Sequence, residues 1–189
     1  MRSTRIIFLA LIAGITSLTQ PAFAGDKVNI VTNVGTIQIE LENEKAPITT
    51  SNFLQYVKSG HYRGTTFHRV MKDFMIQGGG MTEELIEKPT QPPIKLESKT
   101  GLRNQRGTVS MARTGFPDSA TSQFFINLVD NRFLDWDESR DGRGYAVFGR
   151  VIKGMDIVDK ISQVQVTPKG SHSHVPVKPI IIEKTTLEP

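Results

Sequence analysis

Residues 67–80 read FHRVMKDFMIQGGG, and this stretch is the best starting point for the fold. It covers most of two short runs, Thr66–Val70 and Phe74–Gln77, on either side of a segment that contains Asp73. Runs of this length bounded by Gly, Pro, Asp or Asn are typical of short β-strands. The glycine triplet 78–80 follows, and we expect it to give the end of the second strand room to bend.

The rest of the chain has the same texture. Downstream, further short strands are predicted at Thr108–Ala112, Gln123–Asn127, Tyr145–Val151 and Pro179–Glu183. Upstream, Val28–Leu41 predicts a hairpin, because polar and apolar residues alternate in its second half and Gly35 can take a positive φ in the turn. The segment Met81–Arg106 contains three prolines and predicts a long irregular loop.

Helical signals occur in two places. One helix is predicted from near Pro47 to just before Gly60, and a second, shorter one at Asp156–Ile161. Many short strands, two helices and no repeating βαβ unit predict a mainly β fold, a closed antiparallel barrel with helices over its ends.

Length and composition limit the function classes. A chain of 189 residues predicts one domain, and the absence of cysteine excludes disulfides, thiolate zinc sites and a cysteine nucleophile. The net charge is +4, but beyond residue 24 there are 21 basic and 19 acidic residues, or +2. No cluster of lysine and arginine occurs along the chain, so we expect no nucleic-acid partner.

Residues 1–24 predict an export signal. Arg2 and Arg5 precede an apolar run, Ile6–Leu18, and the small-x-small end Ala22-Phe23-Ala24 follows. The run has 13 residues, whereas a helix that spans a bilayer needs about 20. We therefore expect cleavage after Ala24, leaving residues 25–189 as one soluble, exported domain that no longer contacts the membrane.

Several motifs suggest cofactors but are incomplete. The glycine triplet lacks a third fingerprint glycine, since Glu83 occupies that position, and no Lys-Ser/Thr follows it. Asp135, Asp137 and Ser139 are spaced like calcium ligands, but the required Gly and Glu positions hold other residues, so an acidic surface turn is expected. The pair His172 and His174, in a predicted loop, is too small for a zinc site, although incidental metal binding stays open. No cofactor or functional metal is expected.

The sequence also offers little for nucleophilic catalysis. It has neither G-x-S-x-G nor H-E-x-x-H, and Ser110 and Ser122 have no adjacent histidine. What remains is a set of strand motifs that contain one cation, two amides and many large apolar groups: FHRV (67–70), FMIQGG (74–79), SMAR (110–113), SQFFIN (122–127), FLD (133–135) and YAVFG (145–149). Such a set suits an apolar ligand oriented by a few polar groups, without a general base.

These motifs, in this order, resemble the cyclophilins, the cyclosporin-type peptidyl-prolyl cis-trans isomerases. The resemblance runs from Val28 to Glu183, and the ART and DSATSQFF variants, with the export signal, are similar to the periplasmic bacterial branch. It implies a closed eight-stranded antiparallel β-barrel capped by two α-helices. It also implies isomerisation of X–Pro bonds in unfolded or proline-containing polypeptides, without a cofactor, by a monomer.

The resemblance also implies roles for individual residues. Arg69 would donate to the prolyl nitrogen, with Gln77 as its holder. The hollow for the proline ring would be formed by Phe74, Met75, Phe125 and Leu134. Gln123 and the backbone at Ala112 and Arg113 would hold the peptide extended, and His68, Phe133 and Tyr145 would complete the rim.

Three positions depart from the commonest family pattern. Phe133 stands where many members have Trp, Tyr145 where many have His, and Arg113 where many have Asn. Phe133 keeps the apolar area but loses an indole donor, so weak cyclosporin binding is expected. The alternative function is a non-catalytic proline-peptide binding module or holdase chaperone. Arg69 and Gln77 favour the enzyme, because a binder needs only the apolar hollow.

Overall fold

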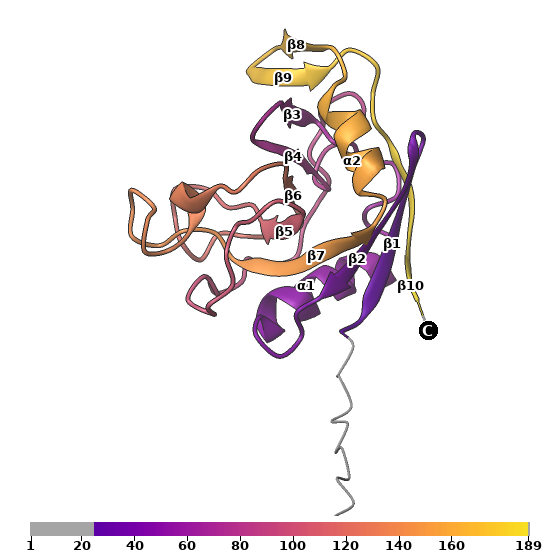
Figure 1. Cartoon of the computed structure of the whole chain (residues 1–189). Helices are drawn as coiled ribbons and strands as arrows, with labels where there is room; N and C mark the ends of the chain where they lie inside the picture. Colours follow the sequence, from indigo (N-terminus) through magenta and orange to yellow (C-terminus); the bar gives the residue numbers. More distant parts are fainter. Residues whose placement is uncertain (1–24, 189) are drawn as a thin grey trace, which may run out of the picture.

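The computed structural model describes residues 25–188, which fold into a mainly β domain with two α-helices (Figure 1). The predicted signal, residues 1–24, lies outside the described residues. An antiparallel eight-stranded sheet has the order β10-β1-β2-β7-β5-β6-β4-β3. Its strands are β1 (Lys27–Thr32), β2 (Gly35–Leu41), β3 (Arg69–Met71), β4 (Met75–Gly78), β5 (Thr108–Met111), β6 (Phe124–Asn127), β7 (Val147–Lys153) and β10 (Ile182–Leu187).

The sheet is an open half-barrel, so the prediction of a closed barrel is wrong. Its edge strands, β3 and β10, do not form a ladder with each other, although an isolated bridge joins Thr66, which precedes β3, to Ile181, which precedes β10. The N–H of Phe67 donates to Ile180 beside this bridge, at 2.9 Å. In this antiparallel register, β3 (Arg69–Met71) would lie opposite residues 178–176, which precede β10, so the bridge does not continue into pairing of β3 with β10.

The predicted hairpin is confirmed as β1 and β2, which pair from Lys27 with Glu40 to Thr32 with Gly35. Gly35 has a φ of +144°, and a Cβ there would lie 2.5 Å from Cδ1 of Ile157 in the helix α2 (Met155–Ser162). Only glycine therefore allows this turn and the docking of α2 against it.

Both predicted helices are present. The first, α1 (Pro47–Lys58), has Pro47 in its first turn and buries Phe53 and Tyr56 in the core. Glu97, in the long irregular loop, accepts the backbone N–H groups of Ile48 and Thr49. It thus supplies hydrogen-bond acceptors to N–H groups at the start of the helix, where no acceptor within the helix is available. In Figure 1 the two helices lie on opposite sides of β7.

A second, two-stranded sheet was not expected. It pairs β8 (Val166–Lys169) with β9 (His172–Pro176), where the sequence predicted a loop. Its strands contain Pro168 and two histidines and show no alternation of apolar residues, which explains why no strand was predicted there. The predicted closing strand, 179–183, is likewise displaced: residues around Ile181 form only the bridge, and β10 begins at Ile182.

Strand alternation divides the apolar residues into two clusters. Phe124 and Ile126 of β6 lie in the main core, where Phe124 packs edge-on against Phe53 at 5.6 Å. Phe125, between them, points the other way and joins Met75 and Leu134 in a second, smaller cluster. Successive side chains on a strand face opposite sides, so this second cluster lies on the other face of the sheet from the main core.

Candidate active site

The smaller cluster lies at a hollow of about 180 Å³. Nine of the residues expected at the site line it: Arg69, Phe74, Met75, Gln77, Ala112, Arg113, Phe125, Leu134 and Tyr145. Four come from the paired strands β3, β4 and β6, and the other five lie outside the strands. The hollow therefore has a strand wall and a loop wall.

The strand wall presents one cation held by an amide. Arg69 and Gln77 face each other in the ladder between β3 and β4, and Nη1 of Arg69 donates to Oε1 of Gln77 at 3.2 Å. Nε2 of Gln77 donates in turn to Oε1 of Gln123 at 2.9 Å. Nη2 of Arg69 also contacts Sδ of Met71 at 3.0 Å. These contacts orient the guanidinium, which stays partly exposed at the mouth of the hollow.

The glycine triplet makes room for this arrangement. A Cβ on Gly80 would come 2.3 Å from Cγ of Gln123, so a side chain there would displace the amide that supports Gln77. Gly79 has a φ of +86° and has the rings of Phe124 and Tyr62 within 2.8 Å of its missing Cβ. The triplet thus serves packing.

The loop wall begins at a 3-10 turn, η1 (Arg132–Leu134), which follows β6. Its last residue, Leu134, is buried in the hollow, whereas Phe133 is 57% exposed. The ring of Phe133 stacks on that of Phe74, with centroids 5.6 Å apart. Phe133 therefore lies beside the hollow but outside its lining, as a rim residue would.

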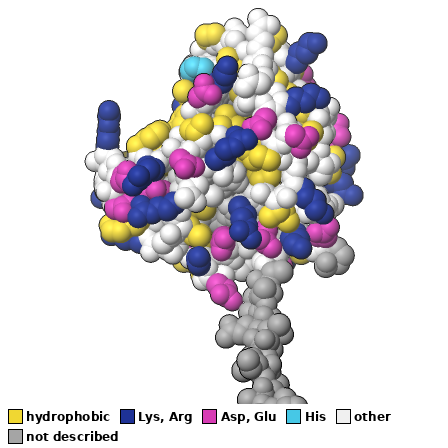
Figure 2. All heavy atoms as spheres, viewed as in Figure 1, with side chains coloured by type: hydrophobic (Ala, Val, Ile, Leu, Met, Phe, Trp, Pro, Cys, Tyr) yellow, Lys and Arg dark blue, Asp and Glu magenta, His cyan; other side chains and the backbone are white. Residues whose placement is uncertain are grey.

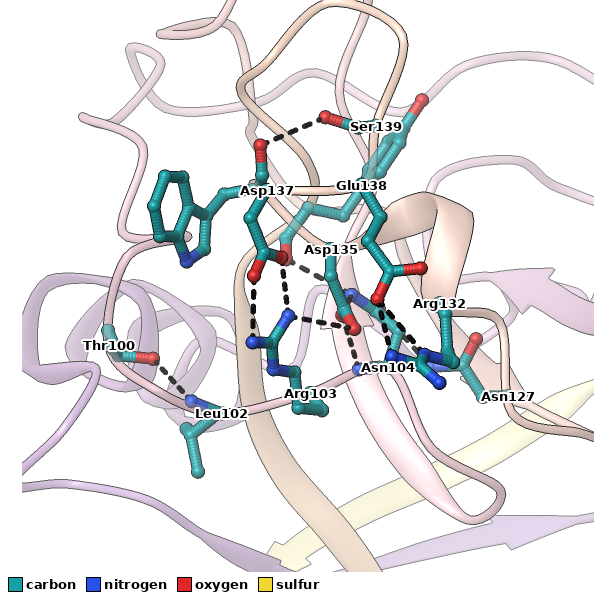
Figure 3. Close-up of polar contacts among 12 residues, drawn as sticks. Thr100, Leu102, Arg103, Asn104, Asn127, Arg132, Asp135, Asp137, Glu138 and Ser139 are labelled. Carbon is teal, nitrogen blue, oxygen red and sulfur yellow. Dashed lines mark hydrogen bonds and ion pairs between the residues drawn. The ribbon is translucent and has the colours of Figure 1, made fainter.

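Buried polar side chains hold this wall. Nδ2 of Asn131 donates to the carbonyl of Phe74 at 2.9 Å and to Oδ1 of Asn127 at 2.8 Å. Oδ1 of Asp135 accepts the backbone N–H of Asn104 at 2.8 Å and its side-chain amide at 2.9 Å (Figure 3). Asn104, Asn127, Asn131 and Asp135 are each at most 3% exposed. We call these four side chains, three amides and one carboxylate, the amide network.

No pattern in the sequence indicates the amide network. An asparagine in a polar segment looks the same whether it is buried or exposed. Asp135 was expected in an acidic surface turn, and this is wrong for that residue, because its carboxylate is the buried acceptor of the network. Its neighbour Asp137 is exposed and accepts from Arg103, which lowers the pKa of that carboxyl (Figure 3).

Arg113 and Tyr145 complete the loop wall. The guanidinium carbon of Arg113 lies 4.7 Å from the centre of the Tyr145 ring, which packs edge-on against Phe125 at 5.6 Å. Asp141 accepts from Nη2 of Arg113 at 2.5 Å, and this bond is the main reason that the pKa of Asp141 lies well below its usual range. The cation of Arg113 is thus neutralised within the wall.

Ala112 and Gln123 lie where the strands β5 and β6 end. The N–H of Ala112 donates to the carbonyl of Gln123 at 2.9 Å, one residue beyond the ladder. The side chain of Gln123 does not line the hollow itself but reaches it through Gln77.

His68, which was expected at the rim, does not line this hollow. It precedes Arg69, and its side chain lines a separate cavity of about 270 Å³ between the loop at Leu85 and the hairpin β8–β9. Neighbours on an extended chain face opposite ways, which explains the difference. Burial lowers the pKa of His68 to about 4, so the imidazole is neutral near pH 7.

The surface charge and the possible metal ligands of the described residues are relevant to what the protein could bind. Basic and acidic side chains are interspersed over the face shown in Figure 2. Within residues 25–188, no group of three or more His, Cys, Asp or Glu side chains could hold a metal ion. Over the same range no helix is both long and apolar enough to cross a bilayer.

Comparisons with known proteins agree on one family. Residues 27–187 match the family described as cyclophilin type peptidyl-prolyl cis-trans isomerase/CLD. The chain is 52% identical over 184 residues to peptidyl-prolyl cis-trans isomerase A of Dickeya dadantii, covering 95% of this chain and 96% of the relative. It is 51% identical over 161 residues to peptidyl-prolyl cis-trans isomerase B of Escherichia coli, covering 85% of this chain and 98% of the relative. A crystal structure of a Cryptosporidium parvum cyclophilin superposes with a TM-score of 0.71 at 29% identity, over 87% of this chain and 98% of that one.

Proposed function

The chain belongs to the cyclophilin type peptidyl-prolyl cis-trans isomerase family, and we propose that the hollow at Arg69 is where it accelerates rotation about X–Pro bonds. The observation that carries this proposal is a guanidinium held by Gln77 beside an apolar hollow of about 180 Å³. A pyrrolidine ring is small and apolar, so it suits a hollow formed by Met75, Phe125 and Leu134.

The chemistry of the bond explains what a cation can contribute. Rotation about X–Pro breaks amide conjugation and has a barrier of about 18–20 kcal/mol. In the twisted state the prolyl nitrogen regains a localised lone pair, which can accept a hydrogen bond that the planar state cannot. A donor aimed at this nitrogen therefore binds the transition state in preference to the substrate. No covalent bond forms or breaks, so no nucleophile is needed.

Arg69 has free donors for this task. Each Nη atom of a guanidinium carries two N–H groups. One from Nη1 is used by Gln77 and one from Nη2 by Met71, which leaves a second N–H on each atom for a substrate. A hydrogen bond from a charged donor contributes about 1.5–3 kcal/mol, or roughly one to two decades in rate. The shape of the hollow must supply the rest of the acceleration.

A protease-coupled assay on a short X–Pro peptide tests this function. The purified protein lacking residues 1–24 should accelerate isomerisation, and EDTA should leave the rate unchanged, because the proposed step uses a hydrogen-bond donor and an apolar hollow and no metal ion. No acceleration over the uncatalysed rate would refute the enzyme and favour a binding module.

We further propose that the protein acts as a periplasmic monomer on unfolded, proline-containing polypeptides that have themselves been exported. The support is the signal-like pattern of residues 1–24, with its basic start and small-x-small end. Cell fractionation with N-terminal sequencing should find a protein in the periplasm that begins at Gly25. An uncleaved protein in the cytoplasm would contradict export.

A further inference from the structure

The loop that follows Leu134 returns to the hollow at Tyr145, and both of these residues line it. The N–H of Tyr145 donates to the carbonyl of Leu134 at 2.9 Å, which joins the two ends. Gly144 has a φ of +63°, and a Cβ there would lie 2.5 Å from the backbone nitrogen of Trp136. The two ends of the loop are therefore packed closely together. The position of the loop wall then depends on the contacts that fix the outer part of the loop.

Asp141 fixes that outer part with both carboxylate oxygens. Oδ1 accepts the hydroxyl of Ser139 at 3.1 Å and the backbone N–H groups of Arg143 at 3.0 Å and Gly144 at 3.3 Å. Oδ2 accepts from Nη2 of Arg113 at 2.5 Å. One oxygen thus closes the loop on itself, and the other ties the loop to the side chain of Arg113.

Arg113 carries this contact to the hollow. Its side chain is only 3% exposed. Nε donates to the carbonyl of Gly144 at 2.9 Å and Nη1 to that of Thr114 at 3.0 Å, while the guanidinium lies over the ring of Tyr145. A buried cation without a counter-ion is costly and moves toward water. Removing Asp141 would therefore release Arg113 from Tyr145.

We propose that Asp141 is a positioning residue for substrate binding, which acts by holding Arg113 against Tyr145 on the loop wall. This inference rests on the proposed function of the hollow. The loop wall contacts the substrate in its planar and twisted states alike, so its loss weakens both by the same amount. Such a loss raises KM and leaves kcat unchanged.

The test is Asp141→Asn, which separates the two jobs of this carboxylate. The remaining amide oxygen can still accept from Ser139 and the loop backbone, but the amide nitrogen cannot accept from Arg113. We expect KM for an X–Pro peptide to rise about three- to tenfold and kcat to stay within about twofold. The matched control is Asp159→Asn, which breaks a pair with Arg106 whose two side chains are each 46% exposed. The control should keep wild-type kcat and KM.

Two further variants identify the route. If Asp141 acts through Arg113, KM of the double variant Asp141→Asn with Arg113→Ala should equal that of Arg113→Ala alone. Wild-type KM in Asp141→Asn, a fall in kcat alone, or losses that multiply in the double variant would each overturn the inference. These outcomes leave the proposed function intact, because it fails only if the wild-type protein itself is inactive.

Discussion

The two walls of the hollow are held in different ways. On the strand wall, Arg69 and Gln77 lie opposite each other because backbone ladders set their register, and side-chain hydrogen bonds between them and to Met71 and Gln123 complete the arrangement. On the loop wall, Leu134 and Tyr145 have no ladder, and buried side chains such as those of Asn131 and Asp135 hold the backbone instead.

The two walls also have different tasks in the site. The donor that must meet the prolyl nitrogen lies on the wall whose register is set by backbone ladders, and a small displacement of this donor would cost most. The three departures from the common family pattern, at Arg113, Phe133 and Tyr145, all lie on the loop side. The strand wall should therefore control kcat, and the loop wall should control KM and ligand selectivity.

The largest effect is expected on the strand wall. Arg69→Ala removes the donor and should lower kcat/KM by about 10- to 100-fold, the worth of one charge-assisted hydrogen bond. A circular dichroism melt should show that the variant is folded, since the guanidinium is partly exposed. A folded Arg69→Ala protein with wild-type kcat/KM would remove this residue from the mechanism.

On the loop side, Phe133→Trp should change drug binding far more than catalysis. Phe133 is 57% exposed and stacked on Phe74, so an indole at this position can present its N–H to a carbonyl of cyclosporin. Restoring one buried hydrogen bond should tighten inhibition about five- to 100-fold, while kcat/KM changes only a few-fold. Titrating both proteins with cyclosporin in one assay measures the difference in inhibition. Equal, tight inhibition of the two would show that an indole donor at this position does not determine cyclosporin binding.

A smaller effect is expected from the amide network. Asn131→Ala leaves the carbonyl of Phe74 and Oδ1 of Asn127 without this donor, which should cost about 1–3 kcal/mol of unfolding free energy. KM should rise about threefold as the loop wall loosens, with little change in kcat. Urea unfolding and steady-state kinetics measure the two quantities.

The matched control for that variant is Asn43→Ala, which removes a side-chain hydrogen bond to Asp26. Both residues are far in sequence from the residues of either wall. It should leave KM unchanged. If kcat rather than KM moves in Asn131→Ala, the proposed division between the walls is wrong.

The smallest effect on catalysis is expected from His68, which lies behind the strand wall. Its pKa is lowered to about 4 in the folded protein, against an ordinary value of 6.5. Between these values the unfolded state binds more protons, so stability should fall as the pH falls from about 6.5 to about 4. His68→Gln should flatten that part of the pH dependence of Tm and leave kcat/KM near pH 7 within about twofold. An unchanged slope would show that His68 is not the responsible group.

The sequence predicted the strand wall better than the loop wall for a physical reason. Short apolar runs such as 74–77, bounded by turn residues, indicate strands from the local sequence, and side chains along a strand alternate between its two faces with a period of two. The same period places the side chains of His68 and Arg69 on opposite faces. Closure of the sheet could not be predicted, since it depends on pairing between β3 and β10, which are more than 100 residues apart.

The loop wall depends on contacts that carry no local pattern. Asp141 and Asn131 look like ordinary polar loop residues, and their partners, Arg113 and Phe74, lie many residues away. The resemblance to a family supplied Leu134 and Tyr145 as site residues but not the side chains that hold them. The hairpin β8–β9 escaped for a similar reason, because it lacks an apolar face along its strands.

The kcat of Arg69→Lys on a short X–Pro peptide tests most directly whether an oriented donor on the strand wall drives the rotation. Lysine keeps the positive charge but lacks the planar fork that Gln77 and Met71 orient. If an oriented donor on the strand wall drives the rotation, kcat should fall about tenfold while KM stays within about threefold. A kcat equal to that of the wild-type protein, or an effect confined to KM, would show that the orientation of this donor does not drive the rotation.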